Sequence, residues 1–324
     1  MKHELRIDVS HAVGSLERLE VAATVVTPTE PLEFNGIVMF GYPGGGYSRR
    51  YYDVDSTTGA DQLSGYSQAL FHASQGAVFV ACDHLGVGDS DIPSQPIDFT
   101  SVAKANAAAS AAILDTLRAG TYARGAAQLD ISSAVAMGQS FGGFLLTIAQ
   151  ADNPVFDGVA FLGWSGIQTI SPYPSGVQSE KLKASHEDGS VAANPRAKSF
   201  HYQDVEPTIV AADLTRDAGR AGSNAPWGSV HRPGGPCLQD RRSPLDPGVV
   251  ANDAARITTP VFVASGEIDV IADPRREAAA YSASTDITIT TFERMAHMHN
   301  FASTRERLWR RLDEWARTVD AVHR

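Results

Sequence analysis

The chain has 324 residues, of which 43% are hydrophobic and 20% are charged, and its formal net charge is −10. These values are typical of an ordinary globular protein with a large core. The acidic balance argues against nucleic acid or an anionic membrane surface as the main partner, because both bind basic patches. We interpret the short basic pairs as solvated surface charges: Arg49 with Arg50, Arg241 with Arg242, and Arg310 with Arg311.

The cysteines and the hydropathy of the chain exclude further classes of protein. The two cysteines, Cys82 and Cys237, provide neither a disulfide framework nor a set of thiolates with metal-ligand spacing. The sequence has no uninterrupted run of about 18 apolar residues, and its start has no apolar core of a secretion signal. We therefore expect a cytoplasmic protein that does not associate with membranes.

The order of short apolar runs predicts an α/β fold. Residues 3–10 and 16–28 alternate apolar and polar side chains, which favours an antiparallel hairpin at the edge of a sheet. Six nearly continuous apolar runs follow, as expected of strands buried on both faces of a parallel sheet. They are 36–43, 77–84, 134–140, 158–164, 259–269 and 286–293. Helical patterns cover 101–120, 141–152, 274–284 and 303–322. We expect a mostly parallel sheet of roughly eight strands, flanked by helices.

One region interrupts this rhythm. From 165 to 257 the chain is rich in Pro, Gly, Ser, Asp and Arg and has few long apolar runs. A structureless loop of this length is improbable inside a compact domain. We interpret it as a cap inserted between the sixth and seventh strands, so that 1–164 and 258–324 form the core domain.

The stretch MGQSFGGF (137–144) contains the pattern G-x-S-x-G, in Gly138, Ser140 and Gly142. It comes directly after an apolar run and directly before a helical pattern, as a nucleophile elbow requires. A serine at such a turn has strained backbone angles, and larger side chains two residues away would crowd it. The turn also points the hydroxyl at the helix N-terminus, where unpaired amides can stabilise negative charge.

With three further motifs, the sequence resembles the α/β-hydrolase family over most of its length except the cap. GYPGGGY (41–47) follows the third strand, where the family places an oxyanion loop, although Pro43 stands in place of the family's histidine. DHLGVGDS (83–90) is similar to the family's D-x-x-G-x-G-x-S segment, and we expect it to form a turn beneath the active site. SGEID (265–269) and MAHMHNF (295–301) stand where the family keeps its acid and its histidine.

The resemblance implies a catalytic triad of Ser140, Asp269 and His297, in the chain order of this fold. A serine hydroxyl needs an imidazole to accept its proton, and a carboxylate must hold that imidazole in the right tautomer. We prefer Asp269 to Glu267 and Asp273 because it ends the GEID segment, where the chain leaves the sheet. His299 remains an alternative to His297.

For the oxyanion hole, we expect one donor from the amide of Phe141, the residue after the serine. The second comes from Gly45, with Gly44 as a further contributor, because only residues without a side chain let the backbone approach a substrate carbonyl so closely. We predict no cofactor, since no G-x-G-x-x-G pattern precedes a helix. We also predict no metal, because the H-x-H at 297 and 299 lacks a third ligand at useful spacing.

These features predict a cofactor-independent serine hydrolase that cleaves a small-molecule carboxylic ester or lactone through an acyl-enzyme on Ser140. The aromatic residues near the glycine loop and in the cap suggest an apolar or aromatic substrate group, or else they pack the cap onto the core. Those of the loop are Tyr42, Tyr47, Tyr51 and Tyr52.

Other chemistries stay open on the same triad: thioester or amide cleavage, C–C bond hydrolysis, perhydrolysis and acyl transfer. A ligand-binding protein without turnover is the alternative from another class. Serine at position 140 argues against haloalkane dehalogenases and epoxide hydrolases, which share the fold but place an aspartate nucleophile there.

Overall fold

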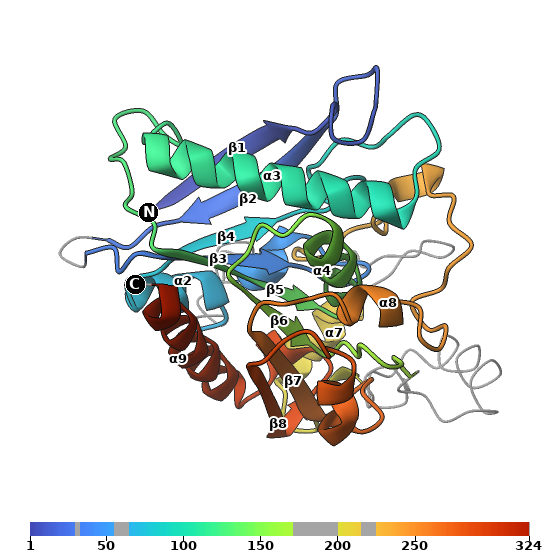
Figure 1. The fold of residues 1–324 in the computed structure, drawn as a ribbon. Coiled ribbons are helices and arrows are strands. Elements are labelled where there is room, and N and C mark those ends of the chain that lie inside the picture. The colour runs from blue at the N-terminus through green and yellow to red at the C-terminus, as the bar shows by residue number, and fades with distance from the viewer. Residues whose placement is uncertain (30–32, 55–64, 171–199, 215–224, 324) are drawn as a thin grey trace.

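The computed structural model describes residues 1–29, 33–54, 65–170, 200–214 and 225–323, and these contain one eight-stranded sheet in the order β1-β2-β4-β3-β5-β6-β7-β8 (Figure 1). The hairpin strand β1 pairs with β2, and β2 pairs with β4, both antiparallel, while all other neighbours are parallel. The strands are β1 (Lys2–Asp8), β2 (Glu20–Val26), β3 (Ile37–Tyr42), β4 (Val78–Cys82), β5 (Ser133–Gln139), β6 (Gly158–Leu162), β7 (Val261–Ile268) and β8 (Ile287–Ala296). The predicted mostly parallel sheet with an antiparallel edge is confirmed.

Helices cover both faces of this sheet (Figure 1). One face carries α3 (Phe99–Ala119), α4 (Phe141–Asp152) and α8 (Ala251–Ala254), and the other carries α2 (Gln68–Ser74) and α9 (Arg305–His323). Alternation along β3 divides the core accordingly: Val38 and Phe40 belong to the first layer, and Ile37 and Met39 to the second. The apolar stripe predicted for the last helix is buried in the second layer, in Leu308, Leu312, Trp315 and Val319.

Two helical segments differ from the prediction. The prediction of a helix over 274–284 is wrong, because the chain forms only a short 3-10 helix there, η5 (Pro274–Ala279). Its hydrogen bonds span three residues, as from the amide of Ala280 to the carbonyl of Glu277. The buried carboxylate of Glu277 turns inward and accepts from Ser165 Oγ (2.6 Å) and the Gly166 amide (2.8 Å), which fixes this tight turn. The sequence does not predict α2, because seven residues are too few to show a period.

The segment between β6 and β7 is described in part. Its described elements are α7 (Pro207–Asp213), the 3-10 helix η4 (Gly235–Cys237) and α8, while the rest of the predicted cap, 171–199 and 215–224, lies outside the described residues. Single β-bridges join this segment to the core, between Tyr47 and Gly228 and between Ile97 and Leu238. The boundaries 165–257 therefore stay a prediction.

None of the helices in the described part of the chain combines the length and the hydrophobicity that crossing a membrane requires. The location of the protein in the cell stays a prediction from the sequence.

Candidate active site

Ser140 occupies a strained turn between β5 and α4. Its backbone has φ 51° and ψ −116°, in the region that residues with a side chain rarely adopt. The Ser140 amide donates to the Leu162 carbonyl at the end of the neighbouring strand β6 (2.8 Å). A Cβ at Gly138 would lie 2.5 Å from the Gly142 oxygen, and one at Gly142 would lie 2.3 Å from the Tyr42 oxygen. Both glycines are therefore required by close backbone contacts, as the motif predicts.

Asp269 and His297 form a buried pair. His297 Nδ1 lies 2.7 Å from Asp269 Oδ1, and the two side chains are 3% and 1% exposed. The carboxylate also accepts from the amides of Gly266 (2.7 Å) and Val270 (2.8 Å). Burial favours the neutral acid, but attraction to His299 and hydrogen bonds from both imidazoles outweigh it and hold the pKa of the Asp269 carboxyl below its ordinary value. An ionised Asp269 keeps the proton of His297 on Nδ1.

The other nitrogen of His297 faces the elbow. Its Nε2 lies 3.5 Å from Nε2 of Gln139, the residue before the serine, and the same amide donates to the His297 carbonyl (3.1 Å). The ring of Phe200 stands perpendicular to the imidazole, with ring centroids 4.9 Å apart. His297 is thus held on three sides, by Asp269, Gln139 and Phe200. Sequence reasoning missed Gln139 and Phe200, since no pattern marks them.

Gly163 connects the serine turn to this pair. It directly follows Leu162, whose carbonyl binds the Ser140 amide, and it has a φ of +59°. A Cβ at Gly163 would lie 2.9 Å from both His297 Nδ1 and Asp269 Oδ1. The end of β6 therefore lies directly between the three residues that the sequence predicts for the triad.

His299, the alternative base, contacts the same carboxylate from the other side. Its Nε2 lies 2.8 Å from Asp269 Oδ2, and its side chain is 1% exposed. Its Nδ1 is buried and has no hydrogen-bond partner among the described residues. The two histidines are therefore not equivalent, because Nε2 of His297 faces the elbow while Nε2 of His299 is bound to Asp269.

The two competing acids have other contacts. Glu267 accepts from the amide of Arg294 (2.9 Å) and from the hydroxyl of Tyr202 (3.3 Å). Asp273 caps η5 by accepting from the amide of Arg275 (3.1 Å). Of the three acids considered from the sequence, Asp269 is the one that binds both histidines.

The glycine loop lies against the elbow. A Cβ at Gly45 would lie 3.4 Å from the ring of Phe141, and one at Gly44 would lie 2.2 Å from Oε1 of Gln139. The loop backbone therefore approaches the first residue of α4, whose amide has no partner within the helix. The structure brings together the three proposed oxyanion donors, Phe141, Gly45 and Gly44.

A buried histidine fixes the start of this loop. His84 Nε2 donates to the Pro43 carbonyl (2.9 Å), and the Asn106 side chain donates to Nδ1 of His84 (2.9 Å). Burial lowers the pKa of His84 to about 4, so the ring is neutral at pH 7. The segment 83–90 thus supports the glycine loop, in keeping with the structural role expected of it.

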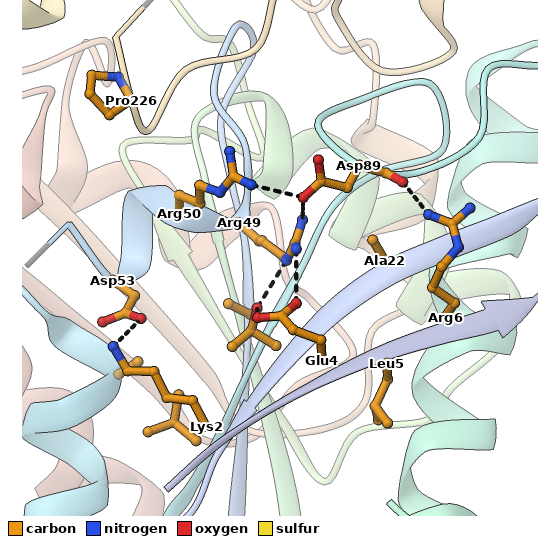
Figure 2. Close-up of a pocket in the computed structure, with 14 residues that line it drawn as sticks. Lys2, Glu4, Leu5, Arg6, Ala22, Arg49, Arg50, Asp53, Asp89 and Pro226 are labelled. Carbon is orange, nitrogen blue, oxygen red and sulfur yellow. Dashed lines mark hydrogen bonds and ion pairs between the residues drawn. The ribbon is translucent and has the colours of Figure 1, made fainter. Parts of the chain in front are cut away.

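The prediction that Arg49 is a solvated surface charge is wrong. The sequence predicts a solvated charge, but the side chain is 7% exposed and is paired with Asp83 (2.5 Å), Asp89 (2.8 Å) and Glu4 (2.9 Å). Arg49 lines a surface cavity of about 700 Å³, together with residues of β1 and β2. Figure 2 shows its guanidinium between Asp89 and Glu4. No sequence pattern indicates this role, because the acids that meet Arg49 come from distant segments. The neighbouring Arg50 is about half exposed, as predicted.

The tyrosines of the glycine loop are packing residues. Tyr42, Tyr47, Tyr51 and Tyr52 are all at most 2% exposed. This burial favours the alternative that these aromatics pack the core and the inserted segment, rather than line a pocket.

Asp213 of α7 joins the inserted segment to the loop. This fully buried carboxylate accepts from Tyr47 Oη, His201 Nε2 and Trp227 Nε1, each at 2.9 Å.

Among the described residues, no group of three or more His, Cys, Asp or Glu side chains is placed to hold a metal ion.

The comparisons with known proteins bear on the fold. The sequence matches no family model and no curated protein. The structure is similar to a proline iminopeptidase from Mycobacterium smegmatis (TM-score 0.61, 15% identity, covering 99% of this chain and 100% of that one). It is also similar to an esterase from Rhodococcus sp. (0.60, 14%, 98% and 99%) and to a haloalkane dehalogenase variant from Bradyrhizobium elkanii (0.55, 15%, 99% and 98%). With its eight-stranded, mostly parallel sheet and its serine turn after β5, this chain has the α/β-hydrolase fold.

Proposed function

We propose that this protein is a cofactor-independent serine hydrolase that cleaves a carboxylic ester or lactone through an acyl-enzyme on Ser140. One observation carries the proposal. The amide of the strained Ser140 donates a hydrogen bond to the carbonyl of Leu162, and the residue after Leu162, Gly163, lies against the Asp269–His297 pair. A serine, an imidazole whose Nε2 faces the serine turn and an ionised carboxylate are the groups that acyl transfer needs.

The geometry supports a two-step reaction. As Ser140 Oγ attacks the carbonyl carbon, His297 Nε2 takes the hydroxyl proton, and Asp269 stabilises the imidazolium that forms. The amides of Phe141 and Gly45, with Gly44 as a further donor, bind the negative oxygen of the tetrahedral intermediate. His297 then gives its proton to the leaving alcohol. In the second step His297 activates a water that releases the acid and restores Ser140.

An ester or lactone is the substrate class that we propose, with the neighbours as support. The similar structures include esterases from Rhodococcus sp. and Thermogutta terrifontis and a protein described as degrading an N-acyl homoserine lactone. The presence of an iminopeptidase among them adds amides to the substrates to be tested.

We further propose that residues 165–257 form a cap over a core domain of 1–164 and 258–324. We also propose that the substrate is a small molecule.

The test is hydrolysis of a panel of ester, lactone, thioester and amide substrates by the wild type and by Ser140→Ala. We expect a loss of at least about 10⁴-fold in kcat for the preferred substrate. The exposed Ser74→Ala serves as the matched control and should keep wild-type activity. A fluorophosphonate probe should label the wild type at Ser140 and leave Ser140→Ala unlabelled. Undiminished hydrolysis by Ser140→Ala would refute the mechanism, and an unlabelled, folded wild type would favour a binding protein.

A further inference from the structure

The carboxylate of Asp269 carries two imidazoles, one on each oxygen. His297 binds Oδ1 through Nδ1 (2.7 Å), and His299 binds Oδ2 through Nε2 (2.8 Å). With the amides of Gly266 and Val270, each carboxylate oxygen has two hydrogen-bond donors. The catalytic mechanism proposed above uses His297 and leaves the second imidazole without a role.

The position of His299 directs its Nε2–H at the carboxylate of Asp269. The ionised carboxylate can only accept, so Nε2 of His299 carries the proton in this contact. The opposite nitrogen, Nδ1, is buried without a partner among the described residues, so the ring is held by the carboxylate rather than by a network of its own. His299 begins the 3-10 helix η6 (His299–Phe301), which is tied to η1 (Arg49–Tyr52) because the Asn300 amide donates to Tyr51 Oη (3.2 Å). This hydrogen bond ties the backbone beside His299 to a buried part of the core.

We propose that His299 is a positioning residue, which holds Oδ2 of Asp269 so that Oδ1 stays aimed at Nδ1 of His297, and which draws negative charge away from that carboxylate. The inference rests on the proposed function, since it assigns His297 as the base. A carboxylate that shares its charge with a second donor stabilises the His297 imidazolium less. Loss of the His299 contact should therefore change how catalysis depends on pH.

The groups around His297 restrict how this effect can arise. Its ring contacts Asp269 from the segment after β7, Gln139 from β5, Gly163 from β6 and Phe200 from the inserted segment. Of these, only Asp269 titrates, and among the described residues that contact this carboxylate His299 is the other titratable group, with its ring centroid 6.2 Å from that of His297. A change in the pH profile caused by substitution of His299 can therefore be traced to this carboxylate.

The experiment compares His299→Gln with His299→Asn. The amide nitrogen of Gln lies the same number of bonds from Cα as Nε2 of His, whereas that of Asn is one bond shorter. We expect Gln to keep kcat within about twofold of wild type, because it can still donate to Oδ2. We expect Asn to lower kcat about tenfold, because the carboxylate is less firmly placed. The acid limb of the kcat/KM profile should move to higher pH in the Asn variant only.

A second readout uses the unmutated protein. Two imidazole N–H protons bound to one carboxylate should give two far-downfield proton resonances, each coupled to a ring nitrogen of a different histidine. Absence of the His299 resonance overturns the inference, even where a variant does not fold. Equal kcat and equal pH profiles for the Gln and Asn variants also overturn it. Failure of the proposed function looks different, because the wild type itself would then remain unlabelled by the fluorophosphonate probe.

Discussion

Gly163 and His297 lie so close that the glycine has no room for a methyl group: a Cβ at Gly163 would come within 2.9 Å of Nδ1. This nitrogen makes the 2.7 Å contact with Asp269. We predict that Gly163→Ala displaces the imidazole and lowers kcat/KM about 100-fold, as a shift of about 1 Å can in an active site.

Gly14→Ala is the matched control for this substitution. Gly14 has a similar φ of +66°, but nothing lies within 4 Å of its added Cβ. Both variants should lose about 1–2 kcal/mol of stability from the left-handed backbone, while activity should fall only in Gly163→Ala. Equal activities in steady-state assays of the two variants would contradict the role of His297 as the base.

Arg49 and Arg50 are neighbours in sequence but should differ in their effect on stability. Arg49→Met leaves the buried Asp83 without its charge partner, which costs about 3–5 kcal/mol in comparable cases. Arg50→Met removes one exposed ion pair with Asp89, and should cost less than about 1 kcal/mol. Urea unfolding of both variants measures the difference, and similar losses would show that the burial of Arg49 has no energetic consequence.

The buried His84 makes stability depend on pH. Its pKa is about 4 in the folded protein, below the ordinary value of about 6.5, so below pH 6.5 the unfolded chain binds a proton that the folded chain does not. Stability is therefore lost as the pH falls from about 6.5 to about 4, by about 3 kcal/mol from this residue. His84→Gln should remove that part of the slope. The exposed His11→Gln should keep the wild-type slope, and the same slope in His84→Gln would count against this assignment.

Tyr47 tests the connection between the inserted segment and the glycine loop. Tyr47→Phe removes a side-chain donor from the buried Asp213, so we expect a loss of about 1–3 kcal/mol. Because the Tyr47 amide also binds the Gly44 carbonyl (3.1 Å), a shift of Tyr47 should move the loop and lower kcat as well. Tyr122→Phe, at a partly exposed tyrosine, should change neither the unfolding free energy nor kcat. A Tyr47→Phe protein as stable and as active as wild type would refute the connection.

Much of the architecture can be predicted, because burial on both faces produces continuous apolar runs, and every strand from β3 to β6 shows one. The turn at Ser140 is equally visible, because the G-x-S-x-G pattern is local, although the contact that requires Gly142 is with the distant Tyr42 oxygen. The helix predicted over 274–284 is wrong because helical propensity is local, whereas the inward turn of Glu277 depends on Ser165, more than 100 residues away.

The surroundings of the site cannot be predicted for the same reason. The roles of Gln139, Gly163 and Phe200 depend on which segments meet His297, and no spacing in the sequence reveals this. His299 is visible as a histidine, but its contact with the second oxygen of Asp269 is not. A motif identifies the residue types, and the fold decides their contacts.

The order of the strands along the chain has a consequence for folding. Gln139 and His297 touch, yet they are 158 residues apart in sequence, and Asp269 and His297 follow the last two strands to be synthesised. Contacts between such distant segments form slowly, because a long loop must close first. The nascent chain therefore contains Ser140 well before the segment that carries His297 has been synthesised. In refolding experiments, labelling of Ser140 should appear only after β7 and β8 have joined the sheet.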